Sequence, residues 1–531
     1  MLGLTVEKNA VPAVRQLCEQ LRLLIGSGQL PAGLKLPSTR QLAAALGIAR
    51  NTVVDAYEQL IAEGFLESRV GSGTYVAEGA DVLRTSRRPV SEAFGGRTGA
   101  APFPSPTPAS PSASSPAPKS ASVPGRLIDF TGGFPDLSLF PRRVWGIHLR
   151  NAVLDSPDDL FGYGDAFGDP VLREQLSAYL FRAKGLRVQP DRIAVVSGSS
   201  EGFLLIAHAL ADRFRTVVVE DPTVEFGRDI FARCGYRLKP VDVDGQGIRA
   251  DLVERLEPEE LMLLTPSHQF PTGSILSVQR RHRLIGLAEA AGSFLIEDDY
   301  DSEFRFKGSP VPPLLALAPE RVIHVGTFSK TLAPGLRLGF VVIPPALVDR
   351  FRQTKDALTL LTPNAEQRAL AAMLASGDFE RHLYRMVKVY RHKRGVLKEA
   401  LETHFPGMLD IRGDDAGMHL LARFRTVAEP DDAAAAGPSE RPEAGLRGSP
   451  DTGRHEPSEA DPSRVKILRN LHDVKWENAV FFGVRIQCAD DYRLAGGGLR
   501  RDLVFGYGHL SAADIREGVA RLAAFLKEAA G

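Results

Sequence analysis

The sequence contains few cysteines and no long apolar run. Its 531 residues include only Cys18, Cys234 and Cys488, which lie far apart and show no CxxC spacing. Such a set argues against a disulfide framework and against a zinc site, and it fits a reducing cytosol. No run of about 18 apolar residues is present, and the first residues lack a basic region followed by an apolar segment. We therefore expect a cytoplasmic protein without a bound metal, a membrane span or a signal peptide.

An excess of either charge sign is also missing. The chain has 65 basic residues (Lys and Arg) and 65 acidic residues, so its formal net charge is zero. Overall charge therefore argues neither for nor against a nucleic-acid partner. The length exceeds that of one ordinary domain, and 44% of the residues are apolar, which suffices for a sizeable core. We expect two or three domains.

Composition divides the chain into two compact parts. Pro, Ser, Ala and Gly dominate residues 80–126, which predicts a flexible, partly polyproline linker because such a segment buries too little apolar surface to fold. A second polar segment, at about 429–462, predicts a disordered loop inside the last domain. The predicted domains are therefore residues 11–79 and 127–528.

The first compact part has the pattern of three helices and a hairpin. Apolar residues recur at helical spacing through residues 11–28, and Ser38 is a suitable N-cap for a second helix that Gly47 would end. A third helix is predicted from near Ala49 to just before Gly64. The run "FLESRVGSGTYV" then gives two β-prone stretches joined by Gly-Ser-Gly. This order predicts a winged helix-turn-helix.

The chemistry of this part fits DNA. Arg50 and Asn51 open the third helix, and these side chain types can pair with guanine and adenine in the major groove. Arg40 and Arg69 suit phosphates. The alternative is a helical protein-interaction domain, because residues 1–76 carry 7 Lys and Arg against 6 Asp and Glu. So weakly basic a domain would need two copies acting together on DNA.

The segment "LPAGLKLPSTRQLAAALGIARNTVVDAYEQLIAEGFLESRVGSGTYV" resembles the GntR-type winged-helix domain over about residues 11–77. The resemblance implies that the domain binds double-stranded operator DNA. It places the DNA contacts on Ser38, Thr39, Arg40, Arg50, Asn51, Thr52, Arg69, Gly71, Gly73 and Thr74.

The second compact part alternates helical stretches with short apolar runs. "RIAVVSG", "TVVVED", "LMLLTPS", "SFLIEDDY", "RVIHVGTFSK" and "LGFVVIP" are strand-like, with helical stretches between several of them. This pattern predicts an α/β domain with a mostly parallel sheet covered by helices. Ligands of such sheets lie beyond the carboxyl ends of the strands, so the polar residues there are candidate site residues.

Polar residues of complementary chemistry follow several of these strands. Small residues at 198–200 open a helix, where free N–H groups suit a phosphate. Asp298 ends a buried strand and needs a partner such as a protonated ring nitrogen. Lys330 ends another, where a Schiff base would use its amine, and Arg337 offers a further phosphate partner. Each alone is more often structural, but their joint occurrence on successive strand ends favours one site.

Together these residues resemble fold-type-I pyridoxal-phosphate enzymes, the aspartate-aminotransferase-like group, with a smaller C-terminal α/β subdomain. "TFSKTLAPGLRLGF" is the most specific motif. The resemblance implies that Lys330 carries pyridoxal 5'-phosphate as an internal aldimine and that Asp298 pairs with the pyridine nitrogen. It assigns the ring hydroxyl to Tyr300, the phosphate to Gly198, Ser199, Ser200, Thr327 and Arg337, and the phosphate held by the partner subunit of a homodimer to Tyr163.

The two resemblances in this order match the MocR subgroup of GntR-type regulators, as do "GGFPDLSLFP", "TPSHQFPTG" and "EDDYDSEFRF". The subgroup implies a homodimeric transcription regulator in which the aminotransferase-like domain is a sensor. The effector would be an amine, an amino acid or a B6 vitamer. An active aminotransferase with an accessory DNA-binding domain, and a DNA-binding dimer with a purely scaffolding rear domain, are the alternatives.

Departures from the transaminase pattern bear on turnover. Val504 takes the place of the arginine that clamps the substrate α-carboxylate, while Arg500 lies just upstream. Val224 takes the place of the usual ring-stacking tyrosine, with Phe226 nearby, and Phe270 replaces the asparagine of the usual NPTG turn. The first two changes argue against sustained transamination, although weak or partial turnover remains open. They favour a sensor, and an effector that is a vitamer or lacks an α-carboxylate.

Overall fold

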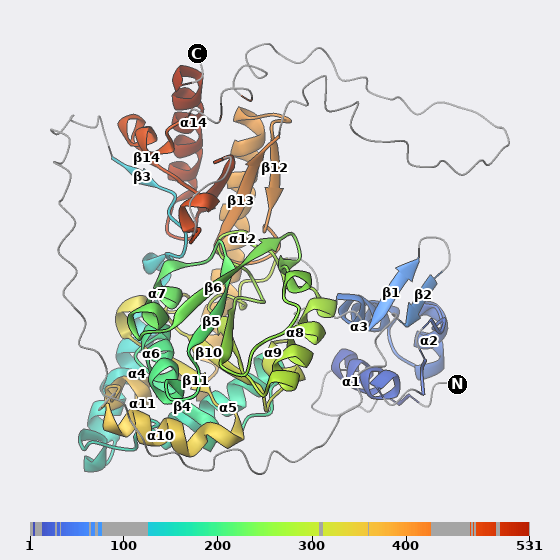
Figure 1. The fold of residues 1–531 in the computed structure, drawn as a ribbon, viewed down its shortest axis with the longest axis vertical. Coiled ribbons are helices and arrows are strands. Elements are labelled where there is room, and N and C mark those ends of the chain that lie inside the picture. The colour runs from blue at the N-terminus through green and yellow to red at the C-terminus, as the bar shows by residue number, and fades with distance from the viewer. Residues whose placement is uncertain are drawn as a thin grey trace.

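The structure is a computed structural model, and its elements are drawn in Figure 1. It describes residues 4–5, 13–26, 29–31, 33–62, 65–69, 73–76, 126–306, 312–358, 361–425, 468, 471, 474–494 and 500–529. The predicted linker, 80–126, lies outside these ranges except for its last residue, and the predicted insert, 429–462, lies outside them entirely. None of the helices in the described ranges combines the length and apolarity that crossing a membrane requires.

The front domain is a winged helix-turn-helix, with the elements that the sequence predicts. Ser38 caps the second helix by accepting from the Gln41 backbone N–H, and Gly47 ends this helix in the left-handed conformation at φ 66°. The Tyr57 hydroxyl donates to Pro37 O at 2.9 Å and so fixes the turn before that helix. The elements are α1 (Ala13–Gly26), α2 (Thr39–Leu46), α3 (Arg50–Ala62), β1 (Leu66–Arg69) and β2 (Gly73–Val76).

The apolar side chains of these three helices and the hairpin form one core. Leu17, Leu21, Leu42, Val53 and Leu60 are all buried in it. They recur at three- and four-residue spacing along the helices, so each helix turns one stripe inward. The opposite faces, which include the start of α3, remain available to a partner.

The rear part is built on an eight-stranded mixed sheet (Figure 1). Strands β9 and β10, for example, pair in parallel, whereas β11 runs antiparallel to both of its neighbours. This is the predicted sheet with one edge extended by β6 and β7. The strand order is β4 (Ile193–Val196), β11 (Gly339–Val342), β10 (Val322–Thr327), β9 (Leu295–Asp299), β8 (Glu260–Leu264), β5 (Thr216–Asp221), β6 (Arg237–Asp244) and β7 (Gly247–Ile248).

Helices cover both faces of this sheet. Alternate residues of each strand, such as Ile193 and Ala194, belong to two different cores, because successive side chains point to opposite faces. The helices α6 (Ser199–Leu210), α7 (Glu225–Arg233) and α10 (Val348–Ala357) pack on one face. The other face is covered by α4 (Arg142–Asp155), α5 (Pro170–Lys184), α8 (Val278–Ala291), α9 (Leu314–Leu317) and α11 (Asn364–Ala375).

A smaller α/β subdomain follows the long helix α12 (Asp378–His404). Its four-stranded antiparallel sheet has the order β12 (Leu409–Arg412), β13 (His419–Phe424), β16 (Asp502–Gly506) and β15 (Gln487–Cys488). The last helix, α14 (Ala512–Ala529), packs against α12, and β3 (Ile128–Asp129) pairs with β14 (Val484–Arg485). Residues before the large sheet therefore complete the small subdomain and bring the segment 130–133 between the two.

Candidate DNA-binding surface and cofactor site

The start of α3 presents polar side chains beside the start of α2. Arg50 and Asn51 are exposed, and Arg50 Nε donates to Thr39 Oγ1 at 3.4 Å, which links the two helices. Ser38 is occupied as the N-cap, so its hydroxyl serves the fold as well as any contact with DNA. The arrangement places a basic and an amide side chain at the amino end of a helix, the end that reads bases in helix-turn-helix proteins.

The other predicted DNA contacts lie on the same domain. Arg40 is exposed on α2, Thr52 is half-buried on α3, and Thr74 faces Ser68 across the hairpin. Gly73 has φ 118°, a conformation that favours glycine. The backbone of Arg69 is described but its side chain is not, and Gly71 lies outside the described residues.

Lys35 was missed by the sequence reasoning. Lys35 is exposed, and its backbone forms an isolated antiparallel β-bridge with Tyr75 of β2. Its ammonium lies 5.7 Å from the centroid of the Tyr75 ring. A Cβ at Gly73 would come within 3.1 Å of the Lys35 side chain, so the lysine lies along the wing. The signal in the sequence was a basic residue just before the turn into α2, which only the bridge to the wing makes meaningful.

The cofactor-type residues predicted from the sequence lie at one edge of the large sheet. Asp298 ends β9, Thr327 ends the neighbouring β10, and the segment 198–200 follows β4. Strand β11 separates β10 from β4, and a Cβ at its first residue, Gly339, would come within 3.1 Å of Gly198 Cα. The sheet therefore brings residues that are far apart in the chain to one place.

Gly198 and Arg337 form a cradle at the start of α6. Gly198 has φ 87°, and a Cβ there would lie 3.2–3.3 Å from the Arg337 guanidinium. Arg337 itself has φ 51°, a rare conformation for a residue with a side chain, and this strain is characteristic of functional sites. Ser199 and Ser200 occupy the first turn of α6, whose free N–H groups favour an anion.

Asp298 is buried without a partner for one of its oxygens. Among the described residues, Asp298 Oδ1 has no hydrogen-bond donor, although the side chain is almost wholly buried. Burial, with the neighbouring Asp299 carboxylate, raises the pKa of Asp298 to about 8. A buried carboxyl with one oxygen unpaired is costly, so this position calls for a cationic or protonated partner.

Lys330 follows β10 and points to the segment between the two subdomains. Its Nζ donates to Gly133 O at 2.7 Å. Burial lowers the pKa of Lys330, although the carboxyl groups of Asp301 and Asp298 oppose this shift. A lysine with a lowered pKa has a larger share of neutral amine, which is the nucleophilic form. Near it, Thr327 Oγ1 donates to Ser329 Oγ at 3.0 Å.

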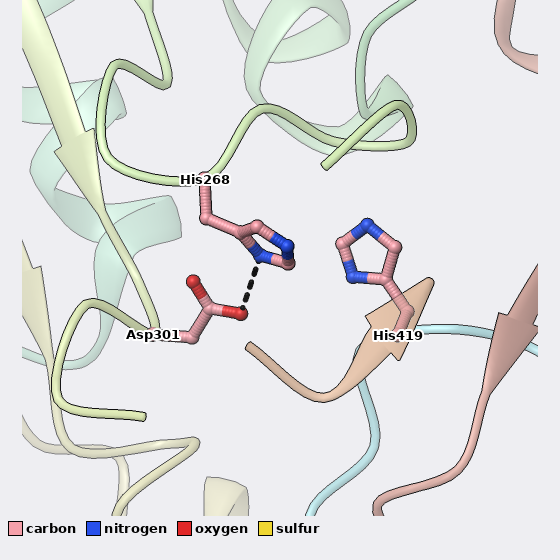
Figure 2. A group of neighbouring side chains, drawn as sticks. All are labelled: His268, Asp301 and His419. Carbon is pink, nitrogen blue, oxygen red and sulfur yellow. Dashed lines mark hydrogen bonds and ion pairs between the residues drawn. The ribbon is translucent and has the colours of Figure 1, made fainter. Parts of the chain in front are cut away.

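Tyr300 belongs to a polar group that the sequence reasoning did not assemble. Its hydroxyl donates to His268 O at 2.7 Å, and His268 Nδ1 lies 3.1 Å from Asp301 Oδ2. Figure 2 shows this His268–Asp301 contact and, facing it, the ring of His419 from β13. The two imidazole centroids are 4.5 Å apart. The motifs "TPSHQFPTG" and "EDDYDSEFRF" contain two of the three residues, but their contact with β13 depends on the tertiary fold.

The three buried residues of Figure 2 are of metal-ligating types, and their ligand atoms lie within 4.8 Å of one another. His268 Nε2 contacts Gly413 O at 3.2 Å, so both of its ring nitrogens are engaged. Burial opposes the protonation of His268, but Asp301 outweighs it and raises the pKa of His268. Burial lowers the pKa of His419 well below its ordinary value. His268 therefore joins Asp301 of the large domain to Gly413 of the small subdomain by hydrogen bonds, and His419 contacts it through its ring.

Tyr163 is the one predicted cofactor residue that projects away from its own chain. It is 89% exposed and lies after a short helical turn that Asn364 holds through two bonds, to Leu160 O and Gly162 O, each of 3.0 Å. In the described chain it is not part of the group around Lys330. A role in cofactor binding requires a second subunit.

The departures from the transaminase pattern lie side by side. Val504 is 1% exposed and packs in an apolar cluster with Phe270 and Tyr492, against which Val224 and Tyr300 also pack. The place expected for a carboxylate-binding arginine is thus filled by aliphatic and aromatic side chains. Phe226 is exposed and turned toward Phe203, with ring centroids 5.8 Å apart.

The residues present fit pyridoxal 5'-phosphate. The unpaired Asp298 oxygen suits a protonated pyridine nitrogen, the cradle of Gly198 and Arg337 suits a phosphate, and Lys330 supplies an amine of lowered pKa. When bound, this cofactor supplies an aldehyde that binds amines covalently and a ring that withdraws electrons.

Comparison with protein families finds one match in the front part of the chain and one in the rear part. The family of bacterial regulatory proteins of the gntR type matches residues 13–76. The aminotransferase class I and II family matches residues 142–436, more than half of the chain.

Individual relatives join both parts. The chain is 36% identical to the probable rhizopine catabolism regulatory protein MocR of Rhizobium meliloti, over 80% of this chain and 85% of the relative. It is 34% identical to the pyridoxine biosynthesis transcriptional regulator PdxR of Corynebacterium glutamicum, over 78% and 83%. Among solved structures, an archaeal alanine:glyoxylate aminotransferase superposes with a TM-score of 0.61 at 25% identity, over 76% of this chain and 92% of that chain.

Proposed function

Because the chain belongs to the MocR-type transcriptional regulators, in which a GntR DNA-binding domain precedes a pyridoxal-phosphate-dependent aminotransferase class I and II domain, we propose a division of labour between its two parts. Residues 11–79 bind operator DNA. Residues 127–528 hold the cofactor and a small effector, and residues 80–126 connect the two. Effector binding beside Lys330 alters the affinity for DNA, and the protein acts in the cytoplasm, where bacterial operator DNA lies.

In this proposal each strand end has one task. Lys330 carries the cofactor, and Asp298 accepts from its ring nitrogen. Tyr300 keeps a lone pair for the ring hydroxyl while its own proton is donated to His268 O. Gly198, Ser199, Ser200, Thr327 and Arg337 bind the phosphate.

DNA binding requires two subunits. The front domain has almost no net charge, so one copy gains little from phosphates, whereas two copies on adjacent half-sites add their contacts. The exposed Tyr163 gives the dimer a second purpose, because it would complete the phosphate site of the partner subunit. Arg50 and Asn51 would read bases, while Arg40, Arg69 and Lys35 would hold phosphates.

A sensor is favoured over an aminotransferase by one observation, the apolar cluster that Val504 forms with Phe270 and Tyr492. An enzyme that turns over amino acids needs a cation for the α-carboxylate in the transition state. A sensor needs only to bind the cofactor and distinguish liganded from unliganded states.

The test is cofactor binding followed by absorbance and DNA binding followed by fluorescence anisotropy, both on the full-length protein. Lys330→Ala should abolish the visible absorbance of the lysine-bound cofactor and its effect on DNA affinity. The exposed Lys527→Ala, on the last helix, is the matched control and should behave as wild type. A wild-type protein that, with pyridoxal phosphate added, shows only the absorbance of the free cofactor and no band that depends on Lys330 would contradict the proposal.

A further inference from the structure

The Lys330 amine lies close to an aromatic surface that the loop after β8 and the small subdomain form together. Its partner is Gly133 O, at 2.7 Å, and the preceding Gly132 lies against Phe270, since a Cβ there would come within 2.8 Å of the ring. The Phe270 ring meets the Tyr492 ring edge-on, with centroids 5.0 Å apart. Any molecule bound beside the Lys330 amine on this side therefore faces Phe270 and Tyr492.

The side chains of the small sheet that lie next to these rings are apolar or uncharged. Val504 of β16 pairs with Leu421 of β13 and with Gln487 of β15, so the three side chains share one face of the sheet. Tyr492 closes this face, because its ring packs on Val504 and its hydroxyl donates to Gln487 Oε1 at 2.6 Å. We call these five residues (Phe270, Leu421, Gln487, Tyr492 and Val504) the apolar wall.

The cations on the same strands are either paired or turned away. Arg423 shares the face of Val504, but its Nε donates to Asp502 Oδ1 at 2.6 Å. Arg500 lies 3.0 Å from Asp491. Arg501 has the strand phase of Leu503 and Phe505, which pack into the core on the opposite face of the sheet. In the described part of β13, β15 and β16, the apolar wall thus has no cation left for a carboxylate.

His419 lies next to the apolar wall as an uncharged side chain. Its ring lies 4.9 Å from Phe270 by centroids, and burial keeps it in the neutral form. It can accept or donate a hydrogen bond, but it supplies no positive charge.

We propose that the effector bound beside Lys330 is a primary amine that lacks an α-carboxylate and carries an uncharged, largely apolar substituent. The inference rests on the proposed function and adds the chemical class of the effector. A carboxylate brought to the apolar wall loses its hydration and gains no charged partner from the described part of β13, β15 or β16, which is unfavourable. Arg228 of α7 is already engaged behind the wall, where it donates to Tyr492 O at 2.6 Å. An apolar substituent gains by leaving water for Phe270 and Tyr492.

The experiment compares amines with the amino acids that differ from them by the carboxylate alone. The pairs are 3-methylbutylamine with leucine and 2-phenylethylamine with phenylalanine. Each is titrated into full-length protein loaded with pyridoxal phosphate, and both the cofactor absorbance and the affinity for DNA are recorded. Each amine should bind about tenfold or more tightly than its amino acid. The reason is that the carboxylate of the amino acid finds no cation to form a charge-assisted hydrogen bond, and such a bond is worth about a factor of ten in affinity.

Two variants add the missing cation. Val504→Arg should narrow or invert the preference for the amine, with Val504→Leu as the control for size. Because Val504 is buried, Gln487→Arg on the half-exposed edge strand is the second variant, with Gln487→Leu as its control. Amino acids that bind the wild type as tightly as their amines would overturn the inference. The inference would also be overturned if none of the four ligands changed the cofactor absorbance or the DNA affinity of a protein that has bound the cofactor. That outcome would leave the proposed function standing. Absence of that absorbance would refute the proposed function as well.

Discussion

Replacing Asp298 by asparagine separates what this residue does for the empty protein from what it does for the cofactor. In the cofactor-free protein, burial raises the pKa of Asp298 from 3.8 to about 8. The folded protein therefore keeps this proton up to about pH 8, whereas the unfolded chain loses it near pH 4. The stability that depends on this proton is complete below pH 4 and falls as the pH rises to 8.

The size of the effect follows from the two pKa values. Each pH unit in this window costs the folded wild type at most about 1.4 kcal/mol, which amounts to roughly 4 kcal/mol between pH 5 and 8 as an upper bound. Asp298→Asn has no such proton, so its unfolding free energy should be flatter over the same range. With pyridoxal phosphate present, the wild type has the advantage, because asparagine has no charge for the ring nitrogen. We expect Asp298→Asn to bind the cofactor about 10–100-fold more weakly than the wild type.

The assay is urea unfolding of the cofactor-free protein at several pH values from 5 to 8, for wild type, Asp298→Asn and the exposed control Asp251→Asn. Wild type and Asp298→Asn differ in this titrating group alone, so the difference between their curves reports Asp298, and the control shows what removal of an exposed carboxyl does. Parallel curves for wild type and Asp298→Asn would refute the reasoning that burial, with one carboxyl oxygen unpaired, raises the pKa of Asp298.

Three further predictions concern the cradle and the front domain. Gly198→Ala should weaken cofactor binding and cost about 1–2 kcal/mol, because its Cβ would meet the Arg337 guanidinium at a positive φ, whereas Gly146→Ala in α4 meets nothing and should be tolerated, as thermal unfolding with and without cofactor will show. Ser38→Ala should lower the stability of the front domain by about 1 kcal/mol through loss of the cap of α2, measured by circular dichroism during urea unfolding; an unchanged midpoint would contradict this. Lys35→Ala should weaken DNA binding uniformly across sequences and reduce the salt dependence by about one phosphate contact, which anisotropy titrations at several salt concentrations will measure.

The sequence was most informative where function and fold use the same local pattern. Ser38 and Gly47 mark the ends of α2, and each acts within a few residues of itself. Asp298 and Lys330 could be placed together because strands of one parallel sheet end at one edge, whatever the loops between them do. The six apolar runs of the sequence correspond to β4, β5, β8, β9, β10 and β11 of the large sheet. Strand β6 was not predicted because its sequence, RLKPVDVD, contains Pro240 and several charged residues, as a loop does. In the structure only Val241 of this strand is buried.

The contacts on which the proposed effector site depends could not be predicted in this way. Gly133 lies 197 residues before Lys330, and nothing in the local sequence of either indicates the contact. The presence of a valine at position 504 was visible, but the closure of that place by Phe270 and Tyr492 depends on how the small subdomain packs against the loop after β8. The same packing brings His419 to the His268–Asp301 contact.

The central claim is that the state of the cofactor site changes DNA binding. Its most direct test is the affinity of the full-length protein for a duplex that the protein has selected from random-sequence DNA, measured with and without pyridoxal phosphate, for wild type and Lys330→Ala. The account predicts that the cofactor changes the wild-type affinity by about fivefold or more and leaves the variant unchanged. Equal affinities for the wild type in both conditions, with the cofactor shown to be bound by its absorbance and no change on adding any of the four test ligands, would contradict it.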